Sequence, residues 1–344
     1  MNEIIKTPHE SWIDCEPVPF HEPNSTRWKL ERRNGVGASE ISVILGFNKY
    51  QSAYELWLEK TGRMPLQNDD PSPQATWGHR MEPFLRDDTA ESTGREIAQI
   101  VGMQSTKYPW LRCSPDGVFC DDGAIFEAKT TGVFQASEWS RGQVADHAEL
   151  QVQTVMAVTG APYAIVAVVI DRGELRLRRV ERDDDELIPL IIEASREFWQ
   201  HVIDDTEPPL DGSDSTRDAL VASFPDHSAD DVVDVDGAAL AFVHEYQQGA
   251  ELEKAGKAQK AAASNKLRHL IGSSSRIVND EGKPLAQLKR GQLSAAKFAK
   301  ENPELAEKLT ITTTKLDTDR LALDHPELFT KYQTTSIYIP KGAA

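Results

Sequence analysis

Cysteine is scarce in this 344-residue chain, and long apolar runs are missing. The three cysteines (Cys15, Cys113 and Cys120) form no CxxC pair, which argues against a zinc or iron–sulfur site and for a reducing cytoplasm. No apolar run approaches the roughly 18–20 residues that span a bilayer. The N-terminal segment also lacks the basic start and apolar core of a secretion signal. We therefore expect a cytoplasmic globular protein.

Basic residues are outnumbered, with 38 Lys and Arg against 55 Asp and Glu and a formal net charge of −17. The acidity is uneven. Residues 183–236 contain 17 Asp and Glu and two Arg, whereas residues 27–63 contain seven Lys and Arg and four Glu. Because contact with DNA depends on the local field rather than on the total charge, the acidity counts weakly against DNA binding without excluding it.

Apolar spacing divides the chain into four predicted segments. They are an N-terminal tail (1–23), an α/β domain (24–205), an acidic linker (206–236) and a helical module with a short β element (237–344). In the α/β domain we expect helices at 40–45, 52–61, 77–92, 147–158 and 187–202, and strands at 99–103, 111–114, 118–119, 124–129, 163–170 and 174–180. Ser39 is expected to cap the first helix. The last segment should contain one or two long helices (237–271), a hairpin (276–289), a helix (316–332) and a strand (334–339).

The stretch SPDGVFCDDGAIFEAK, residues 114–129, contains the residues most suited to catalysis. Asp116 lies on a predicted turn, and Glu127 and Lys129 flank Ala128 in a predicted strand, so both charged side chains point to one face. Burying them is costly unless something offsets their desolvation. A divalent cation held by Asp116, Glu127 and the carbonyl of Ala128 would do so, although a structural ion pair is the alternative. Lys129 would then orient or deprotonate an attacking water, or stabilise a pentavalent phosphate.

Two helical residues extend this predicted site. Glu82 follows His79 by one turn on the helix before the strands, and its place in the chain makes it a candidate third acidic ligand. Gln151 lies one turn before an apolar position of a later helix, where it could hold Lys129 or a water by hydrogen bonds. For either residue alone, an ordinary surface position is the simpler interpretation.

A basic segment near the N-terminus has the composition of a phosphate-binding site. Arg27 and Arg33 precede two glycines and Ser39, at the start of a predicted helix where backbone N–H groups favour anions. A capped helix preceded by solvated basic residues explains the same pattern equally well.

These motifs, in this order, resemble the PD-(D/E)xK nucleases and in particular the YqaJ-like viral recombinase family, which includes the lambda-type 5′→3′ exonuclease. The resemblance runs through residues 27–46, 77–85, 114–117, 126–129 and 149–160. It implies an α/β (α+β) fold with a restriction-endonuclease-like core, in which helices flank a central mixed β-sheet. It also implies a helical C-terminal extension beyond that core.

The resemblance assigns a role to each candidate residue. Glu82, Asp116 and Glu127 match the acidic metal ligands, Lys129 the catalytic lysine and Gln151 its glutamine partner. Arg27 and Ser39 match the positions that hold the 5′-phosphate of the DNA.

The family also implies a cofactor and partners. Mg²⁺ is the expected cofactor, with Mn²⁺ as a substitute, and linear double-stranded DNA is the expected substrate. A phage-type recombination system in a bacterial host, a single-strand annealing partner and a homo-oligomer (a trimer in the lambda-type enzyme) are implied in the same way. Two alternatives stay open: a structure-specific endonuclease on the same core, and a catalytically silent DNA-binding or annealing scaffold.

Overall fold

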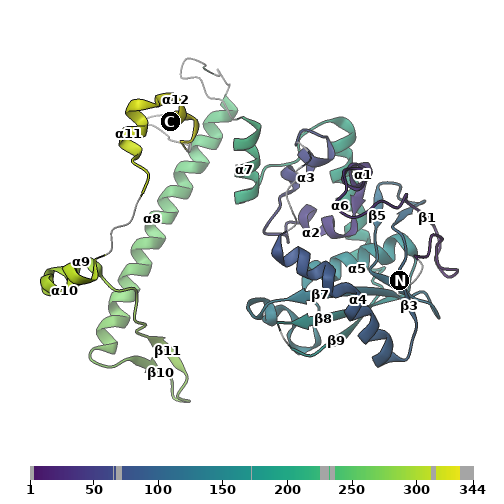
Figure 1. Ribbon diagram of the computed structural model, residues 1–344, viewed down its shortest axis with the longest axis horizontal. Coiled ribbons are helices and arrows are strands. Elements are labelled where there is room, and N and C mark those ends of the chain that lie inside the picture. The colour runs from purple at the N-terminus through teal and green to yellow at the C-terminus, as the bar shows by residue number, and fades with distance from the viewer. Residues whose placement is uncertain are drawn as a thin grey trace. The chain divides into compact units, whose positions relative to one another are not determined.

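The computed structural model describes residues 4–64, 66, 72–171, 173–224, 232, 237–310 and 315–333. The chain forms two compact units, residues 1–227 and 228–344, which we describe separately (Figure 1). Within the described ranges, no helix combines the length and the apolar character that a bilayer-spanning segment requires.

The first unit is built on a five-stranded mixed sheet with the strand order β3-β6-β7-β8-β9. Its strands are β3 (Ile97–Ala98), β6 (Gly117–Phe119), β7 (Ile125–Thr131), β8 (Tyr163–Ile170) and β9 (Arg176–Glu181). The central pair β7 and β8 is parallel, and every other pair is antiparallel. A parallel neighbour requires a crossover connection, which helix α5 (Asp146–Thr159) provides between β7 and β8.

Helices cover both faces of this sheet because strand β7 alternates its side chains between two apolar clusters. Phe126 and Ala128 pack in a cluster that includes Leu85 of helix α4 (Pro73–Thr93). Ile125, on the opposite face, belongs to the larger cluster that contains Val152 of α5. This alternation follows from the two-residue period of a strand. It confirms the predicted α/β (α+β) class with a central mixed sheet flanked by helices.

A second sheet of four short strands packs into the same unit, with the order β1-β4-β5-β2. It comprises β1 (Cys15–Pro17), β4 (Met103–Ser105), β5 (Leu111–Cys113) and β2 (Val36–Gly37). The strand predicted around 99–103 is therefore only partly right. The chain leaves one sheet after Ala98, forms an isolated β-bridge to Ile5 at Ile100, and enters the other sheet at Met103.

The described part of the first unit contains further helices. They are α1 (Thr26–Glu31), α2 (Ile41–Ile44), α3 (Ala53–Lys60), α6 (Leu187–Asp204), α7 (Asp214–Ser223) and the 3-10 turns η1 (Arg32–Asn34), η2 (Ala38–Glu40) and η3 (Val133–Gly142). Helix α7 lies inside the stretch 206–236 that the sequence predicts to be a linker, and it packs against α3.

The prediction that Ser39 caps a helix beginning at Glu40 is wrong. Residues 38–40 form the 3-10 turn η2, and α2 begins only at Ile41. Glu40 turns inward, where its carboxylate accepts a hydrogen bond from the Gly37 N–H at 2.8 Å and pairs with Lys60 at 2.7 Å. These buried contacts decide the local backbone, and Ser39 is left exposed.

In its described residues, the second unit contains one long helix, α8 (Gly237–Ile271), followed by a hairpin of β10 (Arg276–Val278) and β11 (Pro284–Gln287). Four short helices follow: α9 (Ala295–Glu301), α10 (Pro303–Leu309), α11 (Thr318–Asp324) and α12 (Pro326–Lys331). The single helix expected over 316–332 is wrong, because Pro326 lacks the N–H that a continuous helix would need there. The strand expected at 334–339 lies outside the described residues.

Candidate active site

The candidate site forms where strands β6 and β7 pair near the centre of the five-stranded sheet. Gly117 pairs with Phe126 in an antiparallel register, so the preceding residue, Asp116, lies beside Glu127. The carboxylate of Asp116 accepts a hydrogen bond from the backbone N–H of Ala128 at 2.8 Å. This contact attaches the turn that bears Asp116 to the strand that bears Glu127. The hairpin thus brings the two predicted carboxylates together across eleven residues of sequence.

Lys129, Glu127 and Gln151 form a closed triangle of hydrogen bonds. The Lys129 ammonium donates to Glu127 Oε1 at 2.6 Å and to Gln151 Oε1 at 2.8 Å, and the Gln151 amide donates to Glu127 Oε1 at 2.6 Å. Glu127 and Lys129 share a face of β7, as the strand period requires, and that face packs against α5, which carries Gln151. The predicted glutamine therefore contacts both charged groups.

The second carboxylate oxygen of Glu127 is the feature that protein contacts leave unexplained. The side chain is 1% exposed, and Oε2 is buried with no hydrogen-bond partner among the described residues. A buried charged oxygen without a partner costs free energy on the order of 1–3 kcal/mol or more. Burial, together with the negative charge of Asp116, raises the pKa of Glu127 to about 7. These properties fit an oxygen that binds a cation.

Asp116 and Glu82 add further negative charge to the same neighbourhood. Burial, followed by the charge of Glu82, raises the pKa of Asp116 to about 6. Burial also raises the pKa of Glu82, partly offset by a 2.9 Å contact with His79. Glu82 comes from α4, which packs on β7, but its side chain is 35% exposed and bonds to none of the other site residues described. It thus lies at the rim.

A divalent cation fits the donor set, although it would have to draw the groups closer. Asp116 and Glu127 supply hard anionic oxygens of the kind that Mg²⁺ prefers, and Ala128 supplies a carbonyl from the same strand. No three His, Cys, Asp or Glu side chains in the described part of the chain are already clustered at metal-binding distance. Mg²⁺ keeps several of its waters and is often held by only one or two carboxylates, so the donor set is still sufficient.

Sequence reasoning missed Arg86, which lies one turn after Glu82 on α4. Its guanidinium donates to the backbone carbonyl of Asp116 at 3.5 Å, and its buried Nε has no described partner. The side chain lowers the pKa of Asp116 against the stronger effects of burial and Glu82. The sequence signal for Arg86 is its spacing of four residues from Glu82, which places both side chains on the same face of the helix.

The predicted phosphate-binding residues are only partly brought together. Arg27 and Arg33 line a surface pocket of about 430 Å³ with His21, Leu30, Glu31 and Asn34. Ser39 does not line this pocket, and Arg33 also donates to the carbonyl of Met64 at 2.9 Å. Arg27 and Arg33 therefore meet at one pocket, whose lining also includes the acidic Glu31, and Ser39 is not part of it.

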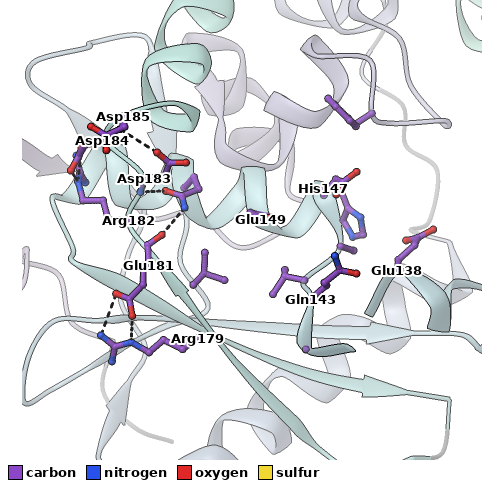
Figure 2. Close-up of a pocket in the computed structure, with 17 residues that line it drawn as sticks. Glu138, Gln143, His147, Glu149, Arg179, Glu181, Arg182, Asp183, Asp184 and Asp185 are labelled. Atoms are coloured by element: carbon purple, nitrogen blue, oxygen red, sulfur yellow. Dashed lines mark hydrogen bonds and ion pairs between the residues drawn. The ribbon is translucent and has the colours of Figure 1, made fainter. Parts of the chain in front are cut away.

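A larger cavity of about 830 Å³ lies between the start of α5 and the end of β9 (Figure 2). Its walls carry seven acidic side chains, and its two arginines are paired, Arg179 with Glu181 and Arg182 with Asp184. None of the predicted catalytic residues lines it. A polyanion would be repelled there, so this cavity is a poor candidate for a phosphate-binding site.

Known proteins resemble the part of the chain that contains the candidate site. Residues 27–162 match the profile of the YqaJ-like viral recombinase domain. The chain is 29% identical over 256 residues to the "Uncharacterized protein YqaJ" of Bacillus subtilis (strain 168), an alignment that covers 72% of this chain and 78% of that protein.

Solved structures with weaker similarity include an alkaline exonuclease (LHK-Exo) from Laribacter hongkongensis. It has a TM-score of 0.46 and 22% identity, and covers 53% of this chain and 94% of that one. A phage related exonuclease from Haemophilus somnus 129PT has a TM-score of 0.33 and 12% identity, and covers 50% of this chain and 96% of that one.

Proposed function

We propose that this protein is a Mg²⁺-dependent nuclease acting on linear double-stranded DNA, since residues 27–162 match the YqaJ-like viral recombinase domain. The observation that carries the proposal is the orphaned Oε2 of Glu127, buried beside Asp116 and next to the contact of Lys129 with Gln151. A purely structural ion pair would leave no charged oxygen without a partner.

Asp116, Glu127 and the carbonyl of Ala128 would hold the cation, with Glu82 completing the acidic set from the rim. Bound Mg²⁺ would acidify a coordinated water and neutralise charge on the scissile phosphate. The donor chemistry supports this assignment, because all four groups offer oxygen.

Lys129 would act beside the cation through its remaining donor. An ammonium has three N–H groups. Two of those of Lys129 donate to Glu127 and Gln151, which leaves one to donate to a water or a phosphate oxygen. Gln151 holds the ammonium in this direction. Lys129 would thereby orient the attacking water and stabilise negative charge as it develops on the phosphate.

We propose further that digestion starts at a 5′ end and leaves a 3′ single strand for an annealing protein. The pocket lined by Arg27 and Arg33 supports this polarity, since two guanidinium groups suit a terminal phosphate dianion. An endonuclease on the same core is the competing activity. A silent scaffold is disfavoured because the Asp, Glu and Lys of the motif are all present, with Lys129 bonded to Glu127 and Asp116 bonded to the backbone N–H of the intervening Ala128.

The experiment that tests the proposal is digestion of linear duplexes, labelled at either end and made with or without a 5′-phosphate, with covalently closed circles as a control. We expect Mg²⁺-dependent loss of the linear strand from the 5′ end, faster with the phosphate, and intact circles. Asp116→Ala and Lys129→Ala should slow cleavage by a factor of about 10² or more, whereas the exposed controls Asp88→Ala and Lys107→Ala should leave the rate unchanged. Nicked circles would establish an endonuclease, and wild-type turnover in either active-site variant would disprove the mechanism.

A further inference from the structure

The two units of the chain differ sharply in charge. The whole formal charge of −17 falls in residues 1–227, while residues 228–344 contain 16 Lys and Arg and 16 Asp and Glu. Within the second unit, residues 254–300 contain eleven Lys and Arg against two acidic residues, a formal charge of +9. We call residues 254–300 the basic segment. A strongly acidic catalytic unit is thus joined to a strongly basic stretch of chain.

The basic segment begins on the second half of α8 and continues through the β10–β11 hairpin, which packs against the end of that helix (Figure 1). At 3.6 residues per turn, Lys254, Lys257 and Arg268 fall within an arc of about 60° on one side of the helix. Lys260 lies about 60° further round the helix. All four side chains are exposed. They form a row about 21 Å long at a rise of 1.5 Å per residue.

Helix stability explains only part of this charge. Cations favour the C-terminal end of a helix, but the effect is confined to the last turn, where only Arg268 and His269 are basic. Lys254 and Lys257 make exposed pairs with Glu251 and Glu253, and such pairs contribute roughly 0–1 kcal/mol. No acidic partner is described for Lys260 or Arg268. The helix-end effect and the exposed pairs therefore do not account for the excess of cations in the basic segment.

The residues between the cations indicate the kind of partner. From Lys254 to Lys266 they are only Ala, Gly, Gln, Ser and Asn, with no large apolar or aromatic side chain. Protein partners are usually anchored by buried aromatic or other large side chains, which residues 254–266 lack, although Leu267 and Leu270 are exposed at the end of the helix. A phosphate backbone needs only a row of cations, and a duplex offers one charge per about 1.7 Å, or about 12 charges along 21 Å. The surface thus matches a nucleic acid better than an acidic protein.

We propose that the basic segment is a second DNA-binding surface, separate from the active site, which holds the phosphate backbone without reading bases. This inference rests on the proposed function, because DNA is the substrate that the chain must retain. Since the catalytic unit carries the net negative charge, the basic segment would supply much of the electrostatic affinity for DNA.

The test is a salt titration of DNA binding by the full chain, in EDTA to prevent cleavage. The probe is a fluorescent duplex of about 30 base pairs, between about 50 and 200 mM salt. The variant Lys257→Gln/Lys260→Gln/Arg268→Gln removes three cations of the row and keeps good helix-forming residues. The matched control, Lys308→Gln/Lys315→Gln/Arg320→Gln, removes three cations of the same unit from outside the basic segment.

We expect the slope of log K against log salt to flatten by about 2.7 units in the row variant, or about 0.9 per lost cation, and to change by less than about 1 in the control. A flattening of less than about 1.5 units in the row variant, or equal flattening in both, would overturn the proposal. The proposal would also be overturned if polyglutamate of matched charge competed for the chain as well as unlabelled DNA does, since the surface would then fit an acidic protein.

Cleavage by the wild-type chain, measured in parallel with Mg²⁺, separates this inference from the proposed function. If the chain cleaves DNA but the slope is unchanged, only the second surface is wrong. If the slope flattens as expected but no Mg²⁺-dependent product forms, the surface stands and the nuclease assignment fails.

Discussion

The contact between Gln151 and Lys129 yields the sharpest kinetic prediction. Gln151 contacts the proposed catalytic groups through two hydrogen bonds of the triangle: it accepts from the Lys129 ammonium at 2.8 Å and donates to Glu127 at 2.6 Å. Replacing it with leucine removes a hydrogen bond to a charged donor, worth about 1.5–3 kcal/mol. If that energy holds Lys129 in its working position, Gln151→Leu should slow turnover by a factor of about 10 to 150.

A double-mutant cycle distinguishes this positioning role from an independent one. Lys129→Met should slow cleavage by a factor on the order of 10²–10⁴, as expected for loss of a group that moves a proton or stabilises charge. In that background, Gln151→Leu should cost clearly less than in the wild type, because its contact with Lys129 is already absent and only its bond to Glu127 remains to be lost. Equal costs in both backgrounds would refute the reasoning.

The assay is single-turnover cleavage of a linear duplex at saturating Mg²⁺, because product release can mask the chemical step under multiple turnover. Thermal unfolding of each variant in the absence of DNA serves as the folding control. Gln151 is half-buried on the face of α5 that meets β7. The melting temperature should therefore change far less than the rate, and a loss of rate that follows a loss of fold would not support the positioning role.

Three further predictions concern the buried ion cluster and the rim ligand. Glu40→Gln should destabilise the first unit by about 3–5 kcal/mol in urea titrations, because buried Lys60 loses its counter-charge, whereas exposed Glu91→Gln should be neutral. Burial alone would raise the pKa of Glu40, but Lys60 and Arg32 overcome it and hold the pKa below its usual range. This stabilisation is thus present above the unfolded pKa of about 4.3 and is lost as pH falls through the folded pKa. Urea unfolding curves of the wild type should therefore show a loss of stability over that pH range, and those of Glu40→Gln should not. Glu82→Gln should raise the Mg²⁺ concentration for half-maximal cleavage more than it lowers the saturated rate, since Glu82 lies at the rim; an unchanged Mg²⁺ titration would contradict its role.

Predictions from strand alternation and helical spacing held where the apolar pattern was long. The period of two in β7 correctly placed Glu127 and Lys129 on one face, and helical spacing found α3, α5 and α6 to within a few residues. Short elements failed for a common reason. The turn at Ser39 and the break at Pro326 depend on one buried carboxylate and one missing N–H, which outweigh the propensity of the neighbouring residues.

By itself, the sequence determined the types of group available for chemistry and the strand that presents two of them. Alternation along β7 is a property of the backbone, so it needed no tertiary knowledge. Only the tertiary structure decided which of those groups meet. The β6–β7 register set Asp116 beside Glu127, packing of α5 brought Gln151 to Lys129, and α4 left Glu82 at the rim. Such contacts join residues far apart in the chain, and they depend on how helices pack over a sheet, which no local pattern encodes.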